Sequence, residues 1–135
     1  MEAFDIHMNE IGKWVCDTIF ISLAHSRDLV SCIISDETVG IDIEYADKRF
    51  DRRKAKRVLG PASYDFYLLK DEESKMLHFC KEWTEKEAIY KATGINLRGL
   101  DIPENEKQKL FTAVIQSRGL PVVLSIYSEY PEEVG

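Results

Sequence analysis

The sequence predicts an α+β fold in which an antiparallel sheet packs against one long helix and several shorter ones. Short runs rich in β-branched and aliphatic residues alternate with polar turns near both ends of the chain. The middle has the capping residues and the spacing of helices instead. No linker, internal repeat or low-complexity tract divides the 135 residues, so we expect one domain over residues 1–135.

Five runs of residues have the composition of strands, with turn-forming residues between them: 19–24, 29–35, 39–44, 110–116 and 122–127. The polar segment 25–28, which begins with His25, is the expected turn of the first hairpin. Arg118 and Gly119 form the expected turn of the last hairpin. The strands therefore precede and follow the helical middle of the chain.

Three helices are expected between the two groups of strands. The first covers a basic segment up to Leu59, where Gly60-Pro61 stops it. A second begins after Ser63, whose hydroxyl is a suitable N-cap. The longest covers residues 71–93, is acidic at its start and is closed by Gly94.

The charge and hydropathy of the chain exclude some classes of function. A formal net charge of -6 argues against general nucleic-acid binding, which needs a basic surface. No stretch approaches the ~20 apolar residues of a membrane span. The first ten residues also lack the layout of a secretion signal. We therefore expect a cytoplasmic protein with no membrane contact.

One segment departs from the acidic character of the rest. Within residues 48–57, the basic patch consists of Lys48, Arg49, Arg52, Arg53, Lys54, Lys56 and Arg57, against one acidic residue. A basic patch on an acidic protein favours a local acidic partner. The ordinary alternative is a solvated helix face.

Two acidic residues share one face of the strand expected over residues 39–44. Because side chains alternate along a strand, Asp42 and Glu44 lie on the face of Gly40, opposite the aliphatic residues. At about 7 Å apart, two carboxylates repel unless water, a cationic side chain or a metal ion lies between them. Gly40 would let a ligand approach closely. The alternative is an ordinary solvated strand face.

A third carboxylate belongs to the longest helix. An apolar stripe on its expected core-facing side consists of Met76, Phe79, Cys80 and Trp83. Glu87 and Lys91 continue this stripe at steps of four residues, and form either an internal ion pair or part of a site. Together with the two strand acids, Glu87 would complete a set of hard oxygen ligands suited to Mg²⁺.

Two segments, in this order, resemble the motifs of the 4'-phosphopantetheinyl transferase superfamily. They are VGIDIE at residues 39–44 and WTEKEAIYK at residues 83–91. The family pattern is a G-[IV]-D strand followed about forty residues later by W-x-x-K-E-[AS]-x-x-K. The segment SLAHS at residues 22–26, the Glu44 position and Gly12-Lys13 resemble elements of the surfactin-type branch. Ala24 and Trp14 depart from that branch, which has serine and proline there.

The resemblance covers about residues 10–130 and implies the phosphopantetheinyl transferase fold. Surfactin-type enzymes resemble two fused copies of a smaller unit, and this chain looks like the C-terminal copy at the length of a holo-acyl-carrier-protein synthase. In the family, coenzyme A lies between two such units. A second chain would then supply the opposite wall of the site, which implies a homo-oligomer or a partner chain.

The resemblance also implies an activity, the transfer of the phosphopantetheine arm of coenzyme A to a serine of an apo acyl or peptidyl carrier protein. Asp42, Glu44 and Glu87 would hold Mg²⁺, and Glu87 would take the proton of the serine. Lys86 and Lys91 would contact the phosphates, with Lys91 close to the departing oxygen. Coenzyme-binding residues would further include Gly12, Lys13 and His25, the last two at the 3'-phosphate.

The carrier protein would meet the basic patch through the acidic helix beside its serine. Fatty-acid, polyketide and nonribosomal peptide synthesis are all compatible destinations. An alternative of another class is a non-catalytic coenzyme-A-binding module or subunit of the same fold.

Overall fold

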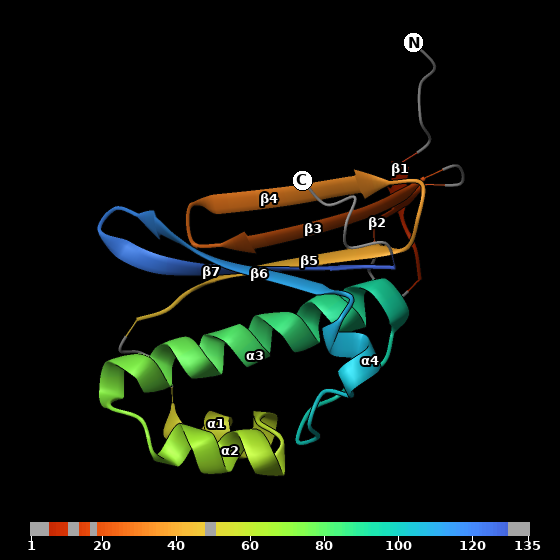
Figure 1. Ribbon diagram of the computed structural model, residues 1–135. Helices are drawn as coiled ribbons and strands as arrows, with labels where there is room; N and C mark the ends of the chain where they lie inside the picture. The colour runs from red at the N-terminus through yellow and green to blue at the C-terminus, as the bar shows by residue number, and fades with distance from the viewer. Residues whose placement is uncertain (1–5, 11–13, 17–18, 48–50, 130–135) are drawn as a thin grey trace.

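In the computed structural model, which describes residues 6–10, 14–16, 19–47 and 51–129, a layer of strands lies along one long helix, with shorter helices beyond it (Figure 1). The strands are β1 (Ile6–Met8), β2 (Trp14–Cys16), β3 (Phe20–Ser26), β4 (Leu29–Ser35), β5 (Val39–Tyr45), β6 (Leu110–Ser117) and β7 (Leu120–Ser128). The helices are α1 (Arg52–Val58), α2 (Pro61–Leu68), α3 (Glu72–Thr93) and α4 (Glu104–Lys107). The predicted α+β class is confirmed.

All strand pairs are antiparallel, as the sequence predicts. β5, β7 and β6 form one sheet in that order, while β3 pairs with β4 and β1 pairs with β2. β3 packs beside β5, and the backbone N–H of Ile41 donates to Ser22 Oγ at 2.9 Å. The core between the β3–β4 hairpin and the β5 sheet includes Ala24, Ile41, Ile43, Tyr45 and Val122.

The other face of β5 lies against α3. An added Cβ atom at Gly40 would lie 2.0 Å from the Ala88 carbonyl oxygen and 2.9 Å from the Ala92 nitrogen, so glycine permits this close approach. The predicted alternation is confirmed, and helix α3 covers the acidic face. Asp42 and Glu44 are half-buried, so the alternative of a solvated strand face is wrong.

Capping residues fix both ends of α3. The Asp71 carboxylate accepts a hydrogen bond from the Ser74 backbone N–H at 2.8 Å. At the other end Gly94 adopts the left-handed conformation, with φ of 77°. The bounds predicted from these two residues are confirmed. Of the predicted apolar stripe, Phe79 and Cys80 are buried, while Met76 and Trp83 are half-buried.

Two local predictions are wrong. α2 begins at Pro61, which is pre-organised for the first helical position, so Ser63 lies inside the helix. The cap comes from a distant residue, because the Asp101 carboxylate accepts hydrogen bonds from the Ala62 and Ser63 N–H groups at 3.2 Å each. His25 belongs to β3 and not to a turn, since the hairpin turns at Arg27 and Asp28.

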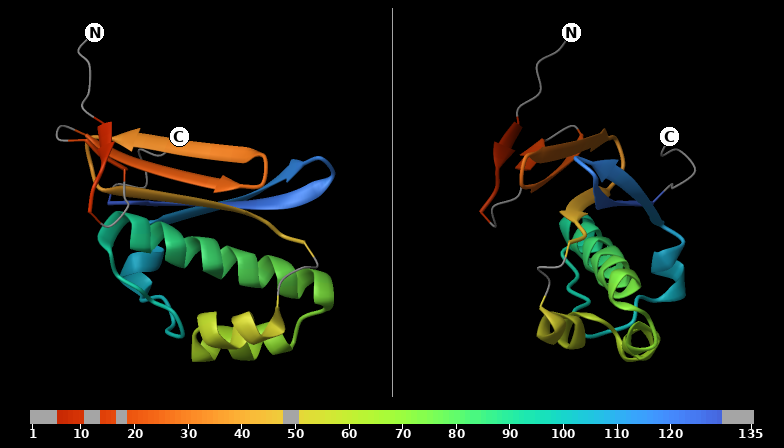
Figure 2. Two further views of the ribbon diagram at one scale, coloured as in Figure 1. Left: turned by 180° about the vertical axis from the view of Figure 1, so that it is seen from behind. Right: turned by 90° about the vertical axis from the view of Figure 1, so that its left-hand side faces the viewer.

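The shorter helices lie away from the sheet. Figure 2 shows α1 and α2 side by side, on the side of α3 that faces away from the strands. The short elements β1, β2 and α4 were not predicted, because three or four residues show no usable periodicity. Among the described helices, none is both long and apolar enough to cross a membrane.

Candidate active site

Lys91 joins the two sequence motifs at the interface of β5 and α3. Its ammonium donates to Asp42 Oδ1 at 3.2 Å and to the Ile41 carbonyl oxygen at 3.0 Å. A third hydrogen bond, also of 3.0 Å, reaches the Leu23 carbonyl oxygen of β3. The Lys91 side chain retains 29% of its exposure and that of Asp42 13%. The contact is therefore a partly buried ion pair that ties the end of α3 to β3 and β5.

The acidic residues at this interface influence one another. Burial raises the pKa of Asp42 to about 6, although the Lys91 ammonium opposes this shift. The Glu87 and Glu44 carboxylates raise this pKa further. Three carboxylates from β5 and α3 thus share one electrostatic environment with one ammonium. An added cation would relieve their mutual repulsion.

Glu44 is held by the neighbouring strand. Ser26 Oγ of β3 donates to Glu44 Oε1 at 3.0 Å, and the same hydroxyl accepts from the Tyr45 backbone N–H at 3.4 Å. The side chains of β3 therefore orient an acidic residue of β5 in addition to closing the core.

The carboxylates of Asp42, Glu44 and Glu87 are the kind of ligand that a hard cation binds. Their oxygen atoms do not, however, form a metal-binding group in this structure. Among the residues that the structure describes, no group of three His, Cys, Asp or Glu side chains could hold a metal ion as it stands. Carboxylate oxygens are nevertheless the ligands that Mg²⁺ takes in proteins. Binding of such an ion by Asp42, Glu44 and Glu87 would require rearrangement of their side chains.

Comparison with known proteins finds one family whose model matches the region that holds both motifs. The model of the 4'-phosphopantetheinyl transferase superfamily matches residues 38–122, which contain all of β5 and α3. The chain belongs to this superfamily.

Two curated relatives carry names from the same superfamily. The 4'-phosphopantetheinyl transferase HetI of Nostoc sp. is 33% identical over 102 residues, which are 70% of this chain and 43% of that protein. The 4'-phosphopantetheinyl transferase gsp of Aneurinibacillus migulanus is 36% identical over 98 residues, 72% of this chain and 40% of that protein. The chain thus matches about two fifths of the length of these relatives.

Lys86 is the motif residue whose position departs from expectation. The superfamily motif suggests a phosphate contact, yet Lys86 is only 4% exposed. Its ammonium donates to the Val58 carbonyl oxygen of α1 and pairs with Glu82 Oε2 at 2.9 Å. These contacts fasten α1 to α3, so the position of Lys86 supports a structural role in place of a phosphate contact.

The remaining predicted coenzyme residues are placed only in part. His25 is exposed on β3, two residues beyond the Leu23 carbonyl group that accepts from Lys91. Gly12 and Lys13 lie outside the described residues.

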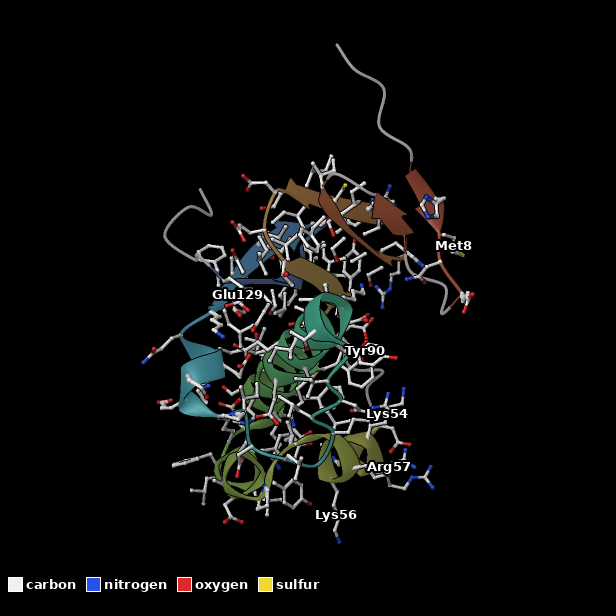
Figure 3. All side chains as sticks on the ribbon, turned by 90° about the vertical axis from the view of Figure 1, so that its right-hand side faces the viewer. Met8, Lys54, Lys56, Arg57, Tyr90 and Glu129 are labelled. Carbon is white, nitrogen blue, oxygen red and sulfur yellow. The ribbon has the colours of Figure 1, made fainter. Side chains whose placement is uncertain are left out.

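The described part of the basic patch lies on α1, on the same side of the molecule as part of α3. Figure 3 shows Lys54, Arg57 and Tyr90 along this side.

Lys48 and Arg49 lie outside the described residues, and the other five cations of the patch are exposed. Arg52 and Arg53 pair with nearby acids. Lys54, Lys56 and Arg57 form no ion pair with a described residue, so they leave a positive surface on α1.

The structure also reveals a cavity that the sequence analysis missed. It has a volume of about 250 Å³ and is lined by Val58, Trp83, Lys86, Glu87, Tyr90, Asn96 and Arg98. Glu87 therefore faces both the acidic interface and a space bounded by α1 and the loop after α3. Residues 96–98 follow Gly94 in a segment with no motif, and their return along α3 could be found only from the tertiary structure.

Proposed function

We propose that this chain transfers the 4'-phosphopantetheine group of coenzyme A to a serine hydroxyl of an apo carrier protein and releases adenosine 3',5'-bisphosphate. The observation that carries the proposal is the contact between Lys91 and Asp42, which brings the two motifs of the superfamily together. Both curated relatives are named as 4'-phosphopantetheinyl transferases. Because the chain matches only part of each, the complete activity is proposed for it here.

In the proposed reaction Glu87 takes the proton from the carrier serine. Glu87 is half-buried and lines the cavity beside α3, where a hydroxyl group could reach it. The serine oxygen forms a bond to the β-phosphorus of coenzyme A, while the bond from that phosphorus to the bridging oxygen breaks. The electron pair of the broken bond leaves with adenosine 3',5'-bisphosphate. Lys91, one helical turn further, offers positive charge to the departing oxygen.

Mg²⁺ held by Asp42, Glu44 and Glu87 would neutralise negative charge on the pyrophosphate. The chain's own contribution is to place three carboxylates and the Lys91 ammonium in one half-buried interface. Burial raises the pKa of Asp42, the Glu87 and Glu44 carboxylates add to this shift, and a cation held by the three would favour the ionised form.

The rest of the coenzyme is assigned to β3 and to the segment before it. His25 is exposed on the strand that Lys91 contacts, so a phosphate held by Lys91 would lie within the neighbourhood of β3. We assign His25 and Lys13 to the 3'-phosphate, and Gly12 to coenzyme binding. A second copy of the chain supplies the opposite wall in this proposal, because the superfamily resemblance places coenzyme A between two such units.

The carrier protein is assigned to the basic patch on α1. Lys54, Lys56 and Arg57 are exposed and form no ion pair with a described residue, which suits an acidic helix. Lys54 and Arg57 lie on the side of the molecule where Tyr90 of the Glu87 cavity is found (Figure 3). A carrier docked there would present its serine towards α3.

A non-catalytic coenzyme-A-binding module is the second candidate function. It is favoured by one observation, namely that Asp42, Glu44 and Glu87 do not stand as a metal-binding group among the described residues. Such a module would bind coenzyme A without changing a carrier protein.

The two candidates are separated by mass spectrometry of apo carrier proteins incubated with the chain, coenzyme A and Mg²⁺. Transfer adds one phosphopantetheine to a carrier, and Glu87→Gln, which keeps the size of the side chain, abolishes the addition. A chain that binds coenzyme A but leaves every carrier unmodified would be the non-catalytic module.

A further inference from the structure

The loop after α3 is fixed on both sides of Arg98. The Asn96 side-chain oxygen accepts from the Arg98 backbone N–H at 3.0 Å, and the Gly99 N–H donates to the Val58 carbonyl oxygen at 3.0 Å. Gly99 has φ of +74°, and an added Cβ there would lie 3.3 Å from the Arg57 carbonyl oxygen. The loop is therefore anchored to the C-terminal end of α1, and the backbone of Arg98 is preorganised.

The side chain of Arg98 is held in place by Trp83 of α3. Its guanidinium carbon lies 5.0 Å from the centre of the indole ring, a cation–π contact. A guanidinium that stacks on a ring can still direct N–H groups at a carboxylate or phosphate in its own plane. Arg98 is exposed and forms no ion pair with a described residue, so its N–H groups are available for an external anion.

Arg98 is a cation that lines the cavity beside Glu87 and has no ion-pair partner among the described residues. The other cation that lines this cavity, Lys86, is buried and paired with Glu82. Lys91 lies one turn along α3 from Glu87, but it contacts β3 and β5 and does not line the cavity. Glu87 thus shares the cavity with Arg98, while Lys91, one helical turn away, contacts the sheet side.

This arrangement indicates which anion Arg98 binds. The phosphates of coenzyme A are assigned above to Lys91 and the sheet side, so the α1 side is left for the other substrate. The cavity reaches Val58, the last residue of α1, and the exposed cations Lys54 and Arg57 lie on the same helix. The positive surface of α1 therefore continues through Arg98 to the edge of the cavity that holds Glu87.

We propose that Arg98 is a specificity-determining residue that binds a carboxylate of the carrier protein close to the serine that is modified. It acts as the innermost contact of the carrier, while the cations of α1 bind acidic residues further from the serine. The inference rests on the proposed transfer. Its chemical basis is a charge-assisted, two-point contact between a guanidinium and a carboxylate.

The test compares Arg98→Gln and Arg98→Lys with the unaltered chain, using the carrier protein that the unaltered chain modifies. The apparent KM for the carrier should rise about tenfold or more in Arg98→Gln, because a lost hydrogen bond to a charged group commonly costs at least this factor. The KM for coenzyme A should change less than about twofold. Arg98→Lys should recover only part of the loss, since an ammonium cannot make the two-point contact.

Lys107→Gln is the matched control, because it removes one exposed positive charge on α4 and does not line the Glu87 cavity. This control should leave both KM values unchanged. Neutralising the acidic residue beside the carrier serine should weaken the unaltered chain but add little to Arg98→Gln, a coupling that a merely structural role of Arg98 would not produce.

Other results would contradict either the inference or the proposed function. If the KM for coenzyme A rises in Arg98→Gln and that for the carrier does not, Arg98 binds a phosphate and the inference is wrong. Unchanged KM values for both substrates in Arg98→Gln would also overturn the inference, while leaving the proposed transfer intact. Failure of the unaltered chain to modify any carrier would contradict the proposed function, and the inference would fall with it.

Discussion

Gly40 of β5 and Ala88 of α3 approach so closely that a single added carbon would not fit between them. A Cβ atom on residue 40 would lie 2.0 Å from the Ala88 carbonyl oxygen, which is a backbone atom and cannot rotate away. This contact sets the distance between the two elements that carry the acidic residues. The glycine of the strand motif therefore has a packing role that is independent of any ligand.

Gly40→Ala should destabilise the fold by about 2 kcal/mol or more, because α3 would have to move from β5. Unfolding in urea measures the change. Gly119→Ala is the matched control, since nothing lies within 4 Å of its added Cβ and only its φ of +75° is unfavourable for alanine. A loss of about 1 kcal/mol is expected for the control. Equal effects of the two substitutions would contradict the close-approach argument.

Lys91→Met should lower the free energy of unfolding by about 1–3 kcal/mol, because Asp42 would lose its charged hydrogen-bond partner. Adding Asp42→Asn to Lys91→Met should restore part of the loss, since the amide carries no charge to be buried. The double-mutant cycle measures this coupling. Additive effects of the two substitutions would show that the ion pair contributes nothing to stability.

Glu85→Gln should make the free energy of unfolding depend less on pH. Burial raises the pKa of Glu85 above its ordinary value of 4.5, although Lys81 and a hydrogen bond from Thr112 oppose the shift. The folded protein therefore binds this proton more tightly than the unfolded chain, and stability falls as pH rises through 4.5 towards the folded pKa.

The glutamine variant avoids this loss. It should gain stability over the unaltered chain between acidic and neutral pH, and the gain should vanish below the unfolded pKa. Urea unfolding across this pH range measures the difference. A difference between the two proteins that does not change with pH would contradict the burial of an ionisable Glu85.

Lys54→Gln combined with Arg57→Gln should raise the KM for the carrier and flatten its dependence on salt. Both side chains are exposed cations of α1, and salt screens contacts between exposed charges. The KM for coenzyme A should be unaffected, because its phosphates are assigned to the sheet side. Steady-state kinetics at two salt concentrations provide the measurement. Carrier affinity that is independent of salt in the unaltered chain would exclude a role for the basic patch.

Local sequence signals predicted the parts of the fold that depend on neighbouring residues. Asp71 and Gly94 gave the bounds of α3, and alternation along β5 placed Asp42 and Glu44 on one face. The start of α2 follows from Pro61, a local signal, but the carboxylate that caps it, Asp101, lies far along the chain. Lys86 was assigned to phosphate because its motif does not show that Glu82 and α1 enclose its ammonium.

The candidate site shows the same division. The order of the motifs predicted that β5 and α3 share a site, and Lys91 confirms that they meet. The three-acid metal site stays a prediction, since side-chain torsions and a bound cation determine where carboxylate oxygens point. The cavity lined by Glu87 and Arg98 depends on how a loop returns along α3, which no local pattern of residues encodes.

The most direct measurement is the intact mass of an apo carrier protein after incubation with this chain, coenzyme A and Mg²⁺. The account predicts that one carrier gains a single phosphopantetheine, that adenosine 3',5'-bisphosphate appears in equal amount, and that Glu87→Gln produces neither. If a folded chain that binds coenzyme A leaves every tested carrier protein unmodified, this result would contradict the account.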